Sequence, residues 1–177
     1  MTNAELAILS LIVEQPRHGY DIEQIIEARG MRDWTEIGFS SIYYLLPKLE
    51  KEALIESELQ QPEGKGPARK VYKITRKGQQ VHREGALAAL SMPQSVSSSF
   101  LLGLSNFPAL PRGQVLAALD SYAEEVGERL THMQQRANEQ SPLPPFVQAM
   151  FNYSQALAEA ELNWIQNFKQ ELEAENV

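Results

Sequence analysis

The stretch SSIYYLLPKLEKEALI, residues 40–55, decides the fold of this chain. On a helix its apolar residues recur with the i, i+3, i+4, i+7 spacing of one buried stripe. These residues are Ile42, Leu45, Leu46, Leu49 and Ala53. The opposite side carries Ser40, Tyr43, Tyr44, Pro47, Lys48 and Lys51. Such a helix can pack on its own domain by one side and present hydroxyl, phenol and ammonium donors on the other.

The segment that follows, ESELQQPEGKGPARKVYKIT at residues 56–75, predicts a hairpin. Residues 54–59 and 70–74 are strand-like, and residues 60–68 hold two glycines and two prolines, which is loop composition. A helix followed by a hairpin with a basic far side predicts a winged helix-turn-helix, a DNA-binding module. The expected fold class is therefore mainly α with a small β-hairpin wing.

The order of elements in the first half agrees with that fold. A helix over residues 4–14 has Asn3 as its expected N-cap, and a second helix begins with the HGYD motif at residues 18–21. With the helix described above, three short helices precede the hairpin. After it, Thr75 is the expected N-cap of a helix that runs to about Leu90.

Charge is distributed unevenly along the 177 residues, whose formal net charge is −7. Residues 1–90 hold 12 basic and 13 acidic residues, whereas residues 91–177 hold 4 and 10. Residues 65–83 contain seven basic residues and no acidic one. Contact with phosphate depends on the local electrostatic field more than on the total charge. The first half is therefore compatible with DNA binding, and the acidic second half is not expected to contact DNA.

The second half predicts helices rather than a second globular core. The serine-rich segment at residues 91–99 reads as a linker, followed by a short helix up to residue 110. Pro111 suits the first turn of a long helix, which the SPLPP break at residues 141–145 ends, and a last helix covers residues 146–173. Two helices of roughly 40 Å cannot bury their apolar sides on each other alone. An antiparallel helical dimerisation domain at residues 111–177 is therefore expected, behind a DNA-binding domain at residues 1–90 and a connecting segment at residues 91–110.

Other classes of protein find little support in the sequence. Without cysteine there are no disulfides, and with no basic leader or apolar run of about 18 residues the expectation is a cytoplasmic protein without a membrane span. His18, His82 and His132 have no metal-ligand spacing, so neither a metal nor another cofactor is expected. No catalytic triad, phosphate loop or carboxylate pair stands out, and no catalytic residue or enzyme is predicted.

Three motifs together resemble the PadR family of bacterial transcriptional regulators, in particular its two-domain members of the phenolic-acid-response and virulence-activator types. They are HGYDI at residues 18–22, the stretch at residues 40–55, and GPARKVYKITRKG at residues 66–78. The resemblance implies a homodimer with one winged helix per subunit for operator DNA and a C-terminal dimerisation domain. It also implies that a small aromatic or hydrophobic effector could release the DNA, as in many members.

The chain departs from that family pattern at two positions of the recognition helix. Ala53 stands where the family often has glycine before the Leu-Ile pair. Pro47 lies seven residues into the helix, where it deletes a backbone hydrogen bond and costs about 3 kcal/mol unless the helix is kinked. Both departures bear on how the helix enters a DNA groove.

DNA binding requires donors for phosphates and for base edges. On the recognition helix and at the HGYD motif, the candidates are Ser40, Ser41, Tyr43, Tyr44, Lys48 and Tyr20. In the wing, they are Lys65, Arg69 and Lys70. Three alternatives stay open: one of the tyrosines at 43 and 44 packs in the core, the wing is merely a solvated basic loop, and the HGYD motif only frames its helix.

Trp164 and Phe168 on the last helix have two interpretations. In the preferred interpretation they are core and dimer contacts, which accounts for the apolar stripe of the last helix. As walls of an effector pocket they would stack on an aromatic ligand.

The resulting hypothesis is a homodimeric repressor on a pseudo-palindromic operator, with the two-fold axis of the dimer matching that of the DNA. The alternative is a winged helix that serves as a protein-interaction module. The basic tract at residues 65–83 favours DNA, because an interaction module has no need of it.

Overall fold

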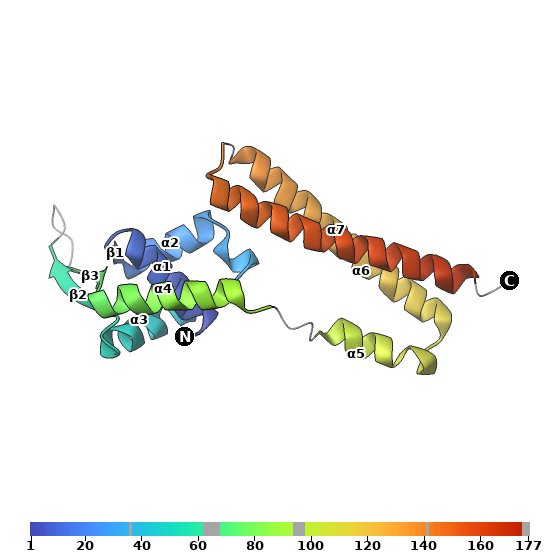
Figure 1. Cartoon of the computed structure of the whole chain (residues 1–177), viewed down its shortest axis with the longest axis horizontal. Coiled ribbons are helices and arrows are strands. Elements are labelled where there is room, and N and C mark those ends of the chain that lie inside the picture. The colour runs from blue at the N-terminus through green and yellow to red at the C-terminus, as the bar shows by residue number, and fades with distance from the viewer. Residues whose placement is uncertain (36, 62–67, 94–97, 141, 175–177) are drawn as a thin grey trace. The chain divides into compact units, whose positions relative to one another are not determined.

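The computed structural model describes residues 1–35, 37–61, 68–93, 98–140 and 142–174. The chain divides into two compact units, which we call unit 1 (Met1–Ser95) and unit 2 (Val96–Val177). Figure 1 shows their elements. Each unit is described by itself.

Unit 1 combines helices with a small antiparallel sheet. Its elements are α1 (Asn3–Glu14), β1 (Arg17–His18), α2 (Gly19–Ala28), the 3-10 helix η1 (Met31–Asp33), α3 (Phe39–Lys51), β2 (Ile55–Gln60), β3 (Arg69–Ile74) and α4 (Arg76–Ser91). The strand order is β1-β3-β2, and Tyr72 of β3 lies opposite Arg17 on one side and Ser57 on the other. The helix order and the hairpin are confirmed, and the two-residue strand β1 is an addition to the prediction.

The first three helices and the sheet share one hydrophobic core. The predicted stripe of α3 is buried at Ile42, Leu45, Leu46 and Leu49, whereas Ala53 is exposed beyond the end of the helix. The fully buried side chains of this core are Ile8, Leu9, Leu11, Ile12, Ile22, Ile26, Ile42, Leu46, Leu49 and Ile55. Burial of the α3 stripe leaves the other side of that helix facing solvent.

Side chains define the starts of α1 and α4. The predicted cap of α1 at Asn3 is wrong by one residue, because Thr2 is the N-cap and forms a capping box with Glu5. The Thr2 hydroxyl accepts from the Glu5 N–H at 3.2 Å, and the Glu5 carboxylate accepts from the Thr2 N–H at 2.7 Å. Thr75 is confirmed as the cap of α4, with its hydroxyl accepting from the Gly78 N–H at 2.9 Å.

Helix α3 ends earlier than the sequence predicted, in a turn that reverses the chain into β2. The Ala53 N–H donates to the Glu50 carbonyl and the Leu54 N–H to the Leu49 carbonyl, both at 2.9 Å. This pair of bonds is a Schellman motif, whose turning residue needs a left-handed backbone. Ala53 occupies that position with φ 55°. The geometry explains why glycine suits this position.

Pro47 does not break α3, which runs as one helical segment from Phe39 to Lys51. Because proline has no N–H, the carbonyl of Tyr43 lacks its usual helical donor. Pro47 is exposed, so this carbonyl lies on the solvent side of the helix. The exposure lets water satisfy it.

Unit 2 is built around a helical hairpin. Its elements are α5 (Ser99–Ser105), the 3-10 helix η2 (Phe107–Ala109), α6 (Arg112–Glu139) and α7 (Pro145–Ala174). Pro111 is the N-cap of α6 rather than its first helical residue. Helices α6 and α7 pack side by side (Figure 1), and the buried apolar residues between them are Val115, Leu119, Val126, Ala158, Ile165 and Leu172.

A second set of apolar residues on α7 stays exposed. They follow one another at steps of three, four and seven residues, and they are Phe146, Met150, Tyr153, Leu157 and Trp164. The helix therefore has one apolar side against α6 and a further apolar side toward solvent. We call this second side the α7 stripe. Among the helices in the described ranges, none combines the length and hydropathy that crossing a membrane requires.

Candidate nucleic-acid interface

Helix α3 presents two tyrosines on its solvent side. Tyr43 is 54% exposed and Tyr44 is 72% exposed, so neither packs in the core. Ser41 is half-buried in the first turn, where the N-cap Gly38 offers no side chain to the free N–H groups. Ser40 belongs to the same turn, but its side chain is outside the described part of the structure. The first half of α3 thus combines two exposed phenols with a helix N-terminus that has no side-chain cap.

The HGYD motif brings the start of α2 close to α3. A Cβ at Gly19 would lie 3.3 Å from the Leu46 side chain and 3.5 Å from the Tyr43 ring, so glycine allows the close approach. The Tyr43 hydroxyl donates to the Glu23 carboxylate at 3.1 Å, and this bond raises the pKa of Tyr43. Its phenol therefore stays protonated, as a donor, at neutral pH. Tyr20 is exposed next to this pair.

His18 connects the same motif to the wing. Its backbone N–H donates to Asp21 at 3.3 Å, and its Nδ1 lies 3.3 Å from the carbonyl oxygen of Lys70. Strand β1 also pairs His18 with Val71 of β3. These contacts support a framing role for His18, whereas Tyr20 keeps an exposed side chain.

Lys48 is held by α1. Its ammonium lies 2.5 Å from the carboxylate of Glu5, a residue that is almost fully buried. Burial alone would raise the pKa of Glu5, but hydrogen bonds from Lys48 and Thr2 outweigh it and lower that pKa. This ion pair fixes α3 against the start of α1, so Lys48 has a structural partner as well as its predicted role toward DNA.

The predicted cations of the wing differ in whether they have a partner within the protein. Arg69 is exposed and, within the described part of the chain, its guanidinium has no hydrogen-bond or ion-pair partner. Lys70 forms an ion pair with Glu50 of α3 at 2.7 Å and lies 5.4 Å from the centre of the Tyr72 ring. Lys65 lies outside the described residues. Glu23 and Glu50, which bind the predicted donors, were missed by sequence reasoning.

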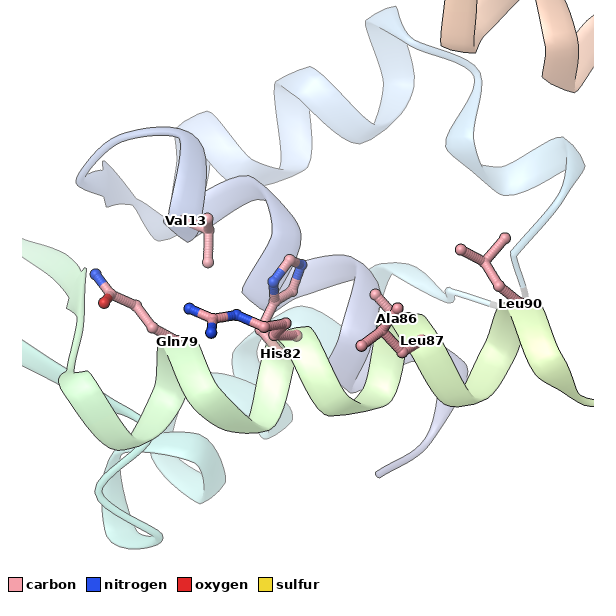
Figure 2. A pocket seen from close by; sticks show the side chains of 7 residues that line it. Val13, Gln79, His82, Ala86, Leu87 and Leu90 are labelled. Atoms are coloured by element: carbon pink, nitrogen blue, oxygen red, sulfur yellow. The ribbon is translucent and has the colours of Figure 1, made fainter.

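A hollow of about 400 Å³ lies elsewhere in unit 1, between α4 and the end of α1 (Figure 2). Its walls are mostly apolar, with Leu87 and Leu90 exposed at 61% and 87%. His82 points toward α1 in Figure 2, and its Nε2 lies 3.0 Å from the Ser10 hydroxyl. The apolar side that the sequence predicts for this helix is thus only partly used by the core of unit 1.

Trp164 and Phe168 stack on each other, with ring centres 5.0 Å apart and planes 24° apart. Phe100 packs edge-on against Trp164, and Phe107 packs edge-on against Phe168. Nearby, burial and a hydrogen bond to Glu161 raise the pKa of Tyr122 to about 12. These rings form an aromatic cluster of unit 2, as in the core interpretation. No group of three or more potential metal ligands occurs among the described residues.

Unit 1 is a winged helix-turn-helix domain. It has a core of three packed helices, a three-stranded sheet, and a recognition helix beside a basic wing. Residues 8–84 match the family described as the Transcriptional regulator PadR-like family, so this part of the chain is a PadR-like domain. Among curated protein sequences, none matches the chain.

Solved structures resemble both units. Bacillus subtilis PadR in complex with operator DNA has a TM-score of 0.78 and 20% identity, over 95% of this chain and 98% of that chain. The same protein in complex with p-coumaric acid has a TM-score of 0.77 and 19% identity, over 96% of this chain and 98% of that chain. The Vibrio cholerae virulence activator AphA has a TM-score of 0.76 and 19% identity, over 97% of this chain and 99% of that chain. At these identities the likeness is one of fold.

Proposed function

We propose that this protein is a DNA-binding transcriptional regulator and not an enzyme. The observation that carries the proposal is the pair of exposed tyrosines on α3, beside a wing whose Arg69 is unpaired among the described residues. Tyr44 offers a phenol donor to a DNA backbone, and both tyrosines offer flat rings, whereas the hydroxyl of Tyr43 already donates to Glu23. Arg69 offers a charged fork to phosphate. Ser41 of α3 and Tyr20 of α2 complete the proposed surface, and Ser40 remains a candidate from the sequence.

The proposed regulator works as a homodimer on a pseudo-palindromic operator. The exposed α7 stripe supports a second copy as its partner, because an apolar stripe of this length is costly to leave in water. Two subunits related by a two-fold axis would place one winged helix on each half-site. Such a protein acts on the chromosome, and we place it in the cytoplasm.

Repression is the proposed mode of action, with the dimer blocking access of polymerase to the promoter. Release by a small aromatic or hydrophobic effector is part of the proposal, supported by the likeness to a structure that holds p-coumaric acid. Trp164 is 45% exposed, whereas its stacking partner Phe168 is half-buried. A ligand in unit 2 would therefore contact Trp164 rather than enter between the two rings.

The direct test is a gel-shift measurement on the DNA upstream of the protein's own gene, at about 50 mM and about 200 mM salt. A specific complex that weakens with salt is expected. Arg69→Ala should weaken binding similarly on all sequences and flatten the salt slope by about one unit per bound subunit. Arg129→Ala, which removes the same charge from unit 2, is the control and should leave the slope unchanged.

Two results would contradict the proposal. Absence of any specific complex would favour a protein-interaction module instead. An unchanged salt slope for Arg69→Ala would remove the wing from the interface. For the effector, a phenolic acid that neither changes Trp164 fluorescence nor releases DNA would exclude a pocket at that residue.

A further inference from the structure

The recognition helix carries an acidic residue on its DNA side. Glu50 follows Tyr43 by seven residues, which is two helical turns, so both lie on the same side of α3. A carboxylate at this place would repel the phosphates that the neighbouring donors attract. Its neutralisation within the protein therefore matters for DNA binding.

Two wing residues hold this carboxylate, and one of them, Lys70, neutralises its charge. The Lys70 ammonium lies 2.7 Å from Glu50 Oε2, and the Ser57 hydroxyl donates to Glu50 Oε1. Ser57 and Lys70 come from different strands, β2 and β3. The hydrogen bond from Lys70 is the main reason that the pKa of Glu50 is lowered, ahead of the bond from Ser57. One side chain of α3 thus joins both strands of the wing.

The strand pairing explains why these groups meet. Ser57 lies directly opposite Tyr72, and Lys70 is two residues from Tyr72, so all three project from one face of the hairpin. The ion pair of Glu58 with Lys73, also 2.7 Å long, belongs to the opposite face, since Glu58 lies opposite Val71. The hairpin therefore has two similar ion pairs, of which one touches the recognition helix.

We propose that Glu50 is an internal counter-anion of the wing, which holds Lys70 in the free protein and competes with DNA phosphate for its ammonium. This inference rests on the proposed DNA-binding function. The competition is possible because the side chains of Lys70 and Glu50 are 46% and 30% exposed, and ion pairs with that much exposure are weak. A phosphate can therefore replace the carboxylate.

The exchange changes how much Lys70 contributes to affinity. When Lys70 moves to a phosphate, the Glu50 carboxylate stays beside the DNA without its cation, so the pair as a whole brings no net positive charge to the duplex. The net release of ions from this contact is close to zero, unlike the release of about 0.9 ions from an unpaired lysine. Glu50 thereby lowers the affinity of the protein for duplex of any sequence and leaves specific contacts on α3 to decide binding.

The test compares four variants with the wild type on a duplex of random sequence, by fluorescence anisotropy across a range of salt. Glu50→Gln should bind more tightly and steepen the salt slope by about 0.9 per bound subunit, which is about eightfold in affinity at 0.1 M salt. Lys70→Met leaves the Glu50 carboxylate without its cation beside the phosphates, so it should weaken binding and flatten the wild-type slope by about 0.9 per bound subunit. Combined with Glu50→Gln, it should return the slope to the wild-type value. Glu58→Gln is the matched control, since it removes the same charge from the other face of the hairpin.

Binding by Glu50→Gln that is equal to that of Glu58→Gln, or weaker than that of the wild type, would overturn the proposal. A purely structural role for Glu50 predicts the weaker binding. A carboxyl titration by NMR tests the contact without DNA: the pKa of Glu50 should rise in Lys70→Met, and an unchanged value would also overturn the proposal. If the wild type binds no duplex at all, both the proposed function and the proposed competition are wrong. A raised pKa of Glu50 in Lys70→Met would then show that the contact exists but is purely structural.

Discussion

Replacing Ala53 by glycine should stabilise unit 1. Ala53 has φ 55°, in the left-handed region where a Cβ costs about 1–2 kcal/mol. Glycine removes that cost but has a larger conformational entropy in the unfolded chain, which offsets about 0.5–1 kcal/mol. The Ala53 side chain is exposed, so its loss removes little packing. The net expectation is a gain of about 1 kcal/mol in the free energy of unfolding.

Urea denaturation followed by tryptophan fluorescence measures this gain. The chain has two tryptophans, one in each unit, so a Trp164→Phe background leaves Trp34 as the reporter of unit 1. In thermal unfolding, the same gain corresponds to about 4–8 °C for a domain of this size. The Schellman hydrogen bonds use only backbone groups and remain available to the variant.

Ala89→Gly in the exposed side of α4 is the control for this substitution. There the backbone is helical, and glycine should cost about 1 kcal/mol. Opposite signs for the two alanine-to-glycine changes are therefore expected. A neutral or destabilising effect of Ala53→Gly would refute the argument, because it would mean that the left-handed backbone is not strained at this position.

Three further predictions concern other contacts. Gly78→Ala should lower the free energy of unfolding of unit 1 by about 1–3 kcal/mol, since a Cβ there would lie 1.9 Å from a backbone oxygen, and urea denaturation checks it. The lowered pKa of Glu5 means that its ion pair stabilises the fold above the unfolded pKa near 4.5 and that this stabilisation is lost as pH falls through the folded pKa. Lys48→Met should therefore be less stable than the wild type at pH 7, with the gap closing below about pH 4.5 in pH-dependent urea denaturation; a constant gap would contradict this. Leu157→Lys on the α7 stripe should reduce the mass in light scattering to the 19.9 kDa of one chain, whereas Gln166→Lys, on another exposed side of α7, should leave it at the dimer value.

Much of the fold could be predicted because its signals are local. The apolar periodicity of α3 and the composition of the wing loop each occupy fewer than about 20 residues, and both were sufficient to place the elements. The end of α3 was wrong because alanine is a good helix former, while the left-handed turn at Ala53 depends on the chain returning as β2. The start of α1 was wrong although its signal was present, since Thr2 and Glu5 have capping-box spacing.

The candidate site could be predicted only in part. The solvent side of a helix follows from its buried side, which is why the exposure of Tyr43 and Tyr44 is as expected. The carboxylates that hold the donors could not be found in this way. Glu23 and Tyr43 are 20 residues apart, as are Glu50 and Lys70, and their meeting depends on how α2, α3 and the hairpin pack.

The carbonyl oxygen of Leu54 ties the start of α4 to the end of α3. It accepts both the backbone N–H and the hydroxyl of Thr75, each at 3.1 Å, and Gly78 lets the first turn of α4 lie directly against it. The Thr75 hydroxyl also donates to the Ala53 carbonyl and the Lys77 ammonium to the Glu52 carbonyl, both at 2.8 Å, so three consecutive carbonyl oxygens after α3 are bound by the first residues of α4 and its cap. Helix α4 therefore cannot shift along its axis without straining the backbone through which the chain leaves α3, so the end of α3 and the start of α4 should move as one body.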